Sequence, residues 1–223
     1  MNPVTLYPTF PGGNVICQVP SHKHLGLVFH ELLSLHDHIT YLSIKNSQRL
    51  GLLMRLRRRL PALTIRQLYV SCIRPTVEYA FIAWCGLQRG DQDVLDRLQR
   101  RAARLITNLS SRSDTPHEIL LTRAGLDSLA SRRQREQRCF MYRLLHKCLP
   151  NHLQLFLEPL LSSKSTKSLS LCNSLSVRLP RAHKNILSSS PLFVCSSSWN
   201  SLPSSAQQSA SLSKFKAFLD SLF

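Results

Sequence analysis

The chain has 223 residues, 43% of them apolar, and a formal net charge of +17. That length and apolar content suffice for one or two folded domains with a core, and the charge predicts a polyanionic partner. No apolar run could span a bilayer, and the start, MNPVTLYPTFPGG, lacks the basic and apolar segments of a secretion signal. We therefore expect an intracellular protein, nuclear or cytoplasmic, that does not contact a membrane.

The first predicted element is a β-hairpin near the amino terminus. Two short apolar or β-branched runs, Val15–Val19 and Leu25–Phe29, are separated by Pro20 and Ser21. Two strands alone are only marginally stable, so the hairpin must pack against another part of the protein. A partner sheet would lie upstream of residue 1, and we therefore expect the chain to be the remainder of a longer polypeptide.

A long basic helix is predicted next, over Leu35–Leu60, because its leucines and isoleucines recur at helical spacing. Pro61 ends it, since proline is poorly tolerated in a helix interior. No acidic residue lies between Asp37 and Glu78, whereas eight lysines and arginines do. Such an uncompensated run of positive charge favours a polyanion nearby, and nucleic acid is the first candidate.

Two shorter helical segments follow. Thr64 is the expected N-cap of a helix over Ile65–Arg74. Pro75 then restarts or kinks the chain, because proline fits a first helical turn better than an interior. The segment Thr76–Trp84 is apolar nearly all round and should be buried.

Gly90 should break the chain before the clearest amphipathic helix, Asp91–Asn108. Its aspartates come early and its arginines late, which complements the helix dipole and is a structural reason for the arginines to be there. Their separate arc also makes them candidates for contacts with phosphates. The arginines that we predict to bind nucleic acid on this helix and the preceding basic one are Arg55, Arg58, Arg59, Arg97, Arg100, Arg101 and Arg104.

Two more helices are predicted from capping signals. Thr115, Pro116 and Glu118 form a capping box, and Gly125 should stop the helix that it opens. Ser128 can cap the next helix, which we expect over Leu129–Leu149.

The composition changes after Leu161, because 19 of the 52 residues from Ser162 to Ser213 are serine. We interpret most of Ser162–Ser176 as a flexible connector. The apolar residues near the end predict a small helix, about Leu212–Leu222, docked on the body together with Trp199. The predicted fold is therefore mainly α: a helical bundle preceded by a short hairpin and followed by a serine-rich linker and a small helical segment.

The chemistry of common enzyme classes is missing. The sequence has no GxxxxGK[ST] or GxGxxG phosphate loop and no GxSxG nucleophile elbow. Its twelve acidic residues are dispersed, whereas two-metal phosphoryl transfer needs carboxylates that converge. Cys139, His146, Cys148 and His152 do not follow the spacing of a zinc site, and the odd number of cysteines indicates free thiols in a reducing compartment. We therefore assign no catalytic residue, metal ligand or cofactor.

Four blocks of the chain carry a resemblance to a known family. The first three are HKHLGLVFHELLSLHDHITYLSIKNSQRLGLLMRLRRRLP, IRQLYVSCIRPTVEYAFIAWCGL and DVLDRLQRRAARLIT, and the fourth is SWNSLPSSAQQSASLSKFKAFL. In this order they resemble the region that follows the catalytic core in reverse transcriptases of LINE-type, non-LTR retrotransposons. The fourth block is similar to the terminus of the jockey and CR1-like branches. The resemblance covers about Val15–Phe223.

The resemblance implies three parts. Residues 1–34 would be the remnant of a palm edge, with Lys23 and Gly26 on a primer-grip hairpin where His24 replaces the usual tyrosine. Residues 35–161 would be a helical thumb that holds a template–primer duplex by its backbone, and residues 162–223 the linker and the WNSLP segment. The finger and palm motifs, with the aspartates that bind Mg²⁺, would precede residue 1. The segment before WNSLP also departs from the family, with Val194, Cys195 and three serines in place of basic and aromatic residues.

The function that follows is that of a catalytically incomplete fragment of an RNA-directed DNA polymerase, not itself an enzyme. It would bind RNA, DNA or an RNA–DNA hybrid through phosphates, and possible protein partners are the missing palm and fingers. Two alternatives stay open: the carboxyl-terminal end of an active reverse transcriptase whose reading frame was cut short, or a basic helical module that binds proteins.

Overall fold

The computed structural model describes residues 18–110, 114–154, 177, 179 and 188–222. These ranges are mainly helical, with a two-stranded antiparallel hairpin at the amino-terminal end, so the predicted fold class is confirmed. The elements in chain order are β1 (Ser21–His24), β2 (Leu27–His30), α1 (His36–Leu56), α2 (Ala62–Leu68), the π-helical turn η1 (Tyr69–Ile73), α3 (Arg74–Glu78), the 3-10 helix η2 (Phe81–Trp84), α4 (Arg89–Thr107), α5 (His117–Ala124), α6 (Leu129–Leu145), α7 (Asn151–Gln154), α10 (Pro191–Asn200), α11 (Ser204–Gln207) and α12 (Leu212–Ser221).

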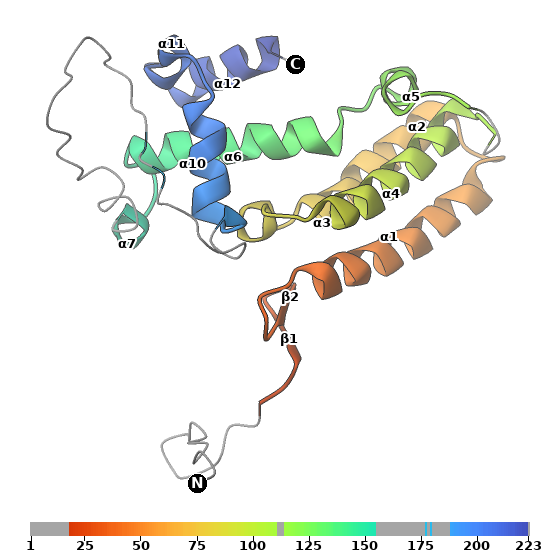
Figure 1. The fold of residues 1–223 in the computed structure, drawn as a ribbon. Helices are drawn as coiled ribbons and strands as arrows, with labels where there is room; N and C mark the ends of the chain where they lie inside the picture. The colour runs from red at the N-terminus through yellow and green to blue at the C-terminus, as the bar shows by residue number, and fades with distance from the viewer. Residues whose placement is uncertain (1–17, 111–113, 155–176, 178, 180–187, 223) are drawn as a thin grey trace, which may run out of the picture.

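The described helices pack around two hydrophobic cores. One core is formed by α1 to α5 with the buried Leu27 of the hairpin, and the other by α6, α10, α11 and α12. Figure 1 shows α6 running from the first group of helices to the second, where α10 crosses it. In the described part of the chain, no helix is both long and apolar enough to cross a membrane. The predicted domain limits at residues 34 and 161 stay predictions.

The hairpin forms later in the chain than predicted. Its register places Ser21 opposite His30 and His24 opposite Leu27. The reversal falls at Leu25 and Gly26, with φ of 46° and 86°, and the second value is a conformation that glycine adopts readily. The prediction of a first strand at Val15–Val19 was wrong for its last two residues, which lie before β1, and residues 15–17 lie outside the described ranges.

Buried His38 anchors the hairpin to α1. The backbone N–H of Val28 donates to His38 Nδ1 over 3.4 Å, and the imidazole lies edge-on to Trp84 with ring centroids 5.5 Å apart. Burial, aided by the positive charge of Lys23, lowers the pKa of His38 below its ordinary value. The folded protein therefore favours the neutral imidazole, which can accept the hydrogen bond from Val28.

We expect stability to fall on acidification through His38. Below the unfolded pKa of about 6.5 the unfolded chain binds a proton that the folded chain resists, so the free energy of unfolding decreases by up to about 1.4 kcal/mol per pH unit. Denaturant titrations at neutral and mildly acidic pH would measure this loss in the wild type and in His38→Gln. An equal loss in both proteins would show that His38 is not responsible.

The helix before the π-helical turn starts earlier than predicted. Thr64 was expected to cap it, but α2 begins at Ala62 with Pro61 as its N-cap residue, so Thr64 lies inside the first turn. Because Pro75 has no N–H and its ring crowds the preceding turn, regular α-helical bonding cannot continue through it. The helix changes to π-helical hydrogen bonding in η1, where the N–H of Arg74 donates to the carbonyl of Tyr69, five residues earlier.

The segment after Pro75 is only partly buried. We expected all of Thr76–Trp84 inside, but Tyr79 is exposed and Ala80 takes a left-handed φ of 50° between α3 and η2. The indole N–H of buried Trp84 donates to the Tyr79 carbonyl over 2.8 Å, which closes this turn. Exposed Tyr79 has a structural role, because its hydroxyl donates to the Leu25 carbonyl at the tip of the hairpin.

Two of the predicted helix-capping residues are confirmed, and two other predicted helix boundaries are wrong. Gly125 ends α5 with φ of 62°, and Ser128 Oγ accepts from the N–H of Ser131 at the start of α6, both as predicted. The N-cap residue of α5 is Pro116 rather than Thr115, so the predicted capping box is misplaced by one residue. Gly90 does not break the chain, because α4 already begins at Arg89.

The predicted small terminal helix, docked on the body together with Trp199, is confirmed as α12 in the second core. Trp199 is fully buried, and its ring centroid lies 5.7 Å from that of Phe215 on α12 and 6.5 Å from that of Tyr142 on α6. Serine-rich α10 was not predicted, although Ser190 caps it and Pro191 occupies its first turn. The connector predicted over Ser162–Ser176 lies outside the described ranges.

The five cysteines in the described ranges are free thiols. Two of them, Cys85 and Cys195, meet in the second core with their sulfur atoms 4.0 Å apart. In the described ranges, no group of three or more histidine, cysteine or acidic side chains is placed to hold a metal ion.

Candidate nucleic-acid interface

Helices α1 and α4 lie side by side and run in the same direction (Figure 1). Their starts are joined by His36 Nδ1 and Asp91 Oδ1, which are 2.9 Å apart. A groove of about 420 Å³ follows between the two helices, with Val94 and Leu98 among its apolar residues. We name it the α1–α4 groove, and its polar lining consists of Thr40, Ser43, Ser47, Arg97 and Arg101.

The two arginines of this groove are held beside its hydroxyl groups. Arg101 Nη1 donates to Ser47 Oγ over 3.3 Å, and Arg97 lies one helical turn before Arg101. Both side chains are exposed, and no carboxylate in the described ranges lies within ion-pair distance of either. The groove therefore combines two accessible, uncompensated guanidinium groups with three hydroxyl groups.

Arg58 lies at the far end of the same helix pair. With Arg57 it lines a cavity of about 620 Å³ that also contacts Leu105, Ile106 and Asn108 at the end of α4. The carboxyl end of a helix carries partial negative charge, which favours cations there. The position of Arg58 thus has a structural reason, and it also extends the basic surface beyond the α1–α4 groove.

The other two predicted arginines of α4 lie towards α5. Arg100 is half-buried beside His117, whose pKa is lowered by burial and then by the positive charge of Arg100. The Nε atom of Arg100 is inaccessible and has no hydrogen-bond partner among the residues that the structure describes. Arg104, one turn later, is half-buried as well. Both are less available to a large ligand than Arg97 and Arg101.

Arg55 and Arg59 stand apart from the groove. Both are exposed near the end of α1 and in the turn after it, and neither lines a cavity between α1 and α4. They can contribute to the positive field, but neither side chain forms a hydrogen bond or ion pair with another described residue.

The hairpin residues lie on another side of α1. Lys23 Nζ donates to Tyr41 Oη over 2.8 Å and lies 4.3 Å from the centre of its ring, while Lys45 donates to the same hydroxyl over 3.4 Å. These two lysines lower the pKa of Tyr41. Since each helical residue turns the chain by about 100°, Tyr41 faces about 100° away from Thr40 in the groove.

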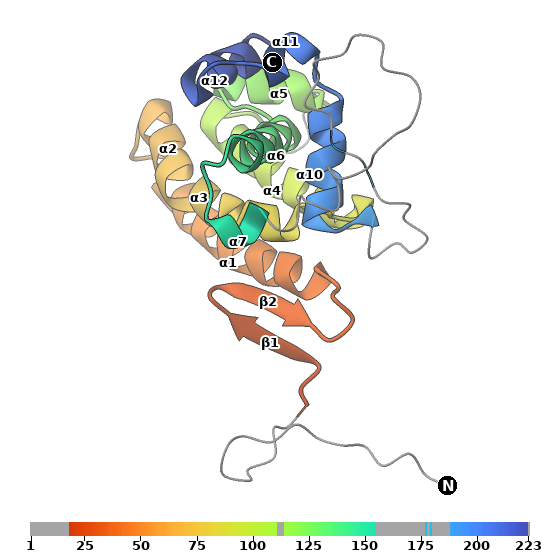
Figure 2. The same cartoon turned by 90° about the vertical axis from the view of Figure 1, so that its left-hand side faces the viewer.

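Gly26 has a packing role at the hairpin tip. A Cβ atom at this position would lie 3.1 Å from Cε1 of Tyr79, and the backbone φ of 86° disfavours other residues. In Figure 2 the hairpin projects beyond the start of α1. The structure therefore does not bring Lys23 and Gly26 to the α1–α4 groove.

Arginines of α6 are occupied differently. Arg132 pairs with Glu78 of α3, and Arg135 Nε donates to Asp220 Oδ1 of α12 over 2.8 Å. Carboxylate hydrogen bonds raise the pKa of both arginines. Arg132 and Arg135 thus join elements of the fold, whereas the arginines of the α1–α4 groove have no such acidic partner among the described residues.

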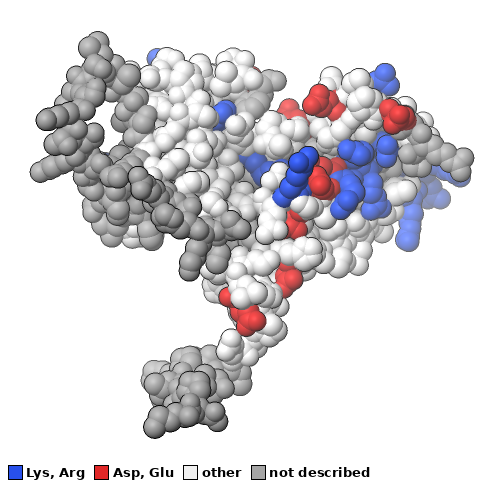
Figure 3. Space-filling model, viewed as in Figure 1, with Lys and Arg blue, Asp and Glu red and all other residues white. Residues whose placement is uncertain are grey.

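On the face of the molecule that Figure 3 shows, most lysine and arginine side chains lie over the helices of the first core, with acidic side chains among them. The hydroxyl groups that line the groove with the arginines were not predicted. Their signal was present, because Thr40, Ser43 and Ser47 are spaced three and four residues apart and so share one face of a helix.

The chain matches no protein-family model, no curated protein and no solved structure. The likeness of its four sequence blocks to LINE-type reverse transcriptases therefore stays a prediction, and the function is argued from the geometry of the groove.

Proposed function

We propose that the α1–α4 groove binds the phosphate backbone of a nucleic acid without regard to base sequence. The observation that carries this proposal is the pair of uncompensated guanidinium groups, Arg97 and Arg101, beside a row of three hydroxyl groups. Arginine, serine and threonine side chains are among the groups with which proteins contact phosphate oxygens. Contacts of guanidinium and hydroxyl groups with phosphate oxygens fix the position of a strand and carry no direct information about its base sequence.

The spacing of the two arginines suits a backbone ligand. Four residues along α4 correspond to about 6 Å along the helix axis, so the two side chains can reach neighbouring phosphates of one strand. Arg58 at the end of the groove and the exposed Arg55 and Arg59 would add to the positive field that attracts the strand.

Together with the sequence resemblance, this groove supports a more specific role. The chain would be the template–primer-holding part of an RNA-directed DNA polymerase of a non-LTR retrotransposon, and the polymerisation chemistry with its Mg²⁺ ions would belong to a palm outside this chain. In this proposal the chain is not an enzyme on its own.

A protein partner is the second candidate, and exposed apolar residues favour it. On α1, Ile44, Leu52 and Met54 are all more than half exposed. Leu52 and Met54 point about 160° apart around the helix, so the three side chains offer separate apolar contacts to another chain or domain and not one patch. The palm and fingers of a polymerase would be such a partner, which makes the two candidates compatible.

Salt dependence of binding tests the proposed function. We expect the purified chain to bind two RNA–DNA hybrids of unrelated sequence equally, measured by fluorescence anisotropy between about 50 and 200 mM salt. If both groove arginines release counterions, a plot of log affinity against log salt should have a slope of about −2 or steeper. Affinity that is insensitive to salt, or that differs strongly between the two sequences, would contradict backbone binding.

A further inference from the structure

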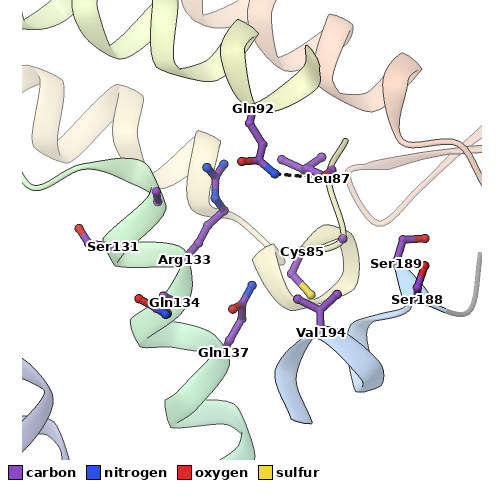
Figure 4. Close-up of a pocket in the computed structure, with 12 residues that line it drawn as sticks. Cys85, Leu87, Gln92, Ser131, Arg133, Gln134, Gln137, Ser188, Ser189 and Val194 are labelled. Atoms are coloured by element: carbon purple, nitrogen blue, oxygen red, sulfur yellow. Dashed lines mark hydrogen bonds between the residues drawn. The ribbon is translucent and has the colours of Figure 1, made fainter. Parts of the chain in front are cut away.

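A second site is formed on the other side of α4, around a buried arginine. A cavity of about 600 Å³ lies between α6, the loop after η2, the first turns of α4 and the start of α10 (Figure 4). Its volume is within the range of small-molecule sites. Gln92, which lines it from α4, comes five residues before Arg97 and so faces about 140° away from it. The cavity is therefore distinct from the α1–α4 groove.

Arg133 of α6 is the unusual residue of this cavity. Arg133 is only 6% exposed, and its side chain makes no hydrogen bond or ion pair within the described part of the chain. Its Nη1 atom is inaccessible and without a partner, and its guanidinium lies 5.8 Å from the centre of the Phe81 ring. The carboxylate of Asp96 acts on it only at a distance beyond that of an ion pair.

An unpaired buried guanidinium is costly, because desolvation is not offset by a neighbouring charge. Burial accordingly lowers the pKa of Arg133. Other arginines of α6 avoid this cost: Arg132 pairs with Glu78, and Arg138 donates to the Ser198 carbonyl over 3.4 Å. Arg133 differs from its neighbours in lacking a described acceptor while lining a cavity large enough to hold one.

Gln137 supplies a second polar group to the cavity one helical turn later. It is 8% exposed, lines the same cavity, and its carboxamide forms no hydrogen bond to the described residues. In Figure 4 the Arg133 side chain extends from α6 towards Gln92, and the Gln137 carboxamide points into the same space. Gln92 is held in place by its own Nε2, which donates to the Leu87 carbonyl over 2.9 Å.

We propose that this cavity binds a small oxyanion, a carboxylate or a phosphate group, between the Arg133 guanidinium and the Gln137 carboxamide. The planar fork of arginine donates two parallel hydrogen bonds to either kind of oxyanion, and the amide N–H of Gln137 would donate a third. The single positive charge, flanked by neutral amides, matches a ligand group of one negative charge. This site goes beyond the proposed function and does not depend on it.

Isothermal titration calorimetry of the whole chain tests the proposal with two probes. Sodium phosphate and sodium acetate are titrated separately, with sodium chloride added so that ionic strength is equal throughout. We expect one or both probes to bind, and the tighter one identifies the chemical class of the ligand. If neither produces saturable binding, or if chloride alone reproduces the signal, the proposal is overturned.

Arg133→Met should weaken binding of the bound probe about tenfold or more, because it removes the charged hydrogen bonds. The variant should fold, since it replaces an unpaired buried charge with an apolar side chain of similar length, and its unliganded melting temperature should equal or exceed that of the wild type. Arg133→Lys, which keeps the charge but loses the fork, should bind with intermediate affinity.

Arg143→Met is the matched control, because Arg143 lies on the same helix, carries the same charge and does not line the cavity. It should bind the probes as the wild type does. Equal weakening by Arg143→Met and Arg133→Met would reduce the effect to net charge and overturn the site. Binding of an RNA–DNA hybrid should be unchanged in Arg133→Met, which separates this site from the groove.

Discussion

Replacing both Arg97 and Arg101 by glutamine is expected to weaken binding of an RNA–DNA hybrid by about a hundredfold. Each substitution removes a charged hydrogen bond to phosphate worth about 1.4 kcal/mol, which corresponds to a factor of about ten. The slope of log affinity against log salt should become shallower by about two, one for each lost phosphate contact. Fluorescence anisotropy over a salt series measures both effects in the same titrations.

The control for charge alone is Arg143→Gln on α6, outside the groove. It lowers the net charge by one without touching the groove lining, so it should change the affinity only slightly. A third variant, Ser47→Ala, removes the hydroxyl that accepts from Arg101 and should weaken binding less than the loss of either arginine. If Arg143→Gln weakened binding as much as a single groove substitution, the α1–α4 groove would not be the binding surface.

Trp199→Ala is expected to destabilise the protein by about 3–5 kcal/mol, which is the range for truncation of a buried large aromatic side chain. Trp199 is fully buried between α6 and α12, where Tyr142 and Phe215 pack against it. The cavity left by the indole would separate the carboxyl-terminal helices from α6. Urea denaturation followed by circular dichroism would report the loss as a lower midpoint.

Leu52→Ala provides the comparison for this variant, because Leu52 is an apolar residue that is more than half exposed on α1. It should change the free energy of unfolding by no more than about 0.5 kcal/mol. A loss of similar size in both variants, or a small one in Trp199→Ala, would mean that the second core contributes little to stability.

Prediction from sequence worked where one residue decides a local conformation. Gly125 ends a helix because a left-handed residue is needed there, and Ser128 caps one because its hydroxyl reaches the backbone three residues later. The same reasoning placed Thr64 and Thr115 one or more residues away from the true starts of α2 and α5. A proline stood at each of those starts, and its fixed φ competed with the threonine as the entry to the helix.

Prediction failed where a distant contact decides. The tip of the hairpin at Leu25 and Gly26 is held by Tyr79, more than fifty residues later, whose hydroxyl donates to the Leu25 carbonyl. The exposed position of Tyr79 follows from the same contact, although its neighbours in sequence are apolar. Gly26 is a local signal for a turn, but the contact with Tyr79 has none, since it depends on where α3 and the hairpin meet in space.

For the candidate site, the sequence by itself determined that the chain is basic, mainly helical, and has an amphipathic helix with four arginines on one arc. Periodicity and charge are properties of neighbouring residues, so they can be read without coordinates. Only the tertiary structure decided which arginines share a surface. It placed Arg97 and Arg101 beside the hydroxyl groups of α1 and paired Arg132 and Arg135 with distant carboxylates. It also buried Arg133 with no acceptor among the described residues. The partner of a charged side chain depends on how helices far apart in sequence pack together. That packing cannot be predicted from the positions of the arginines in the sequence.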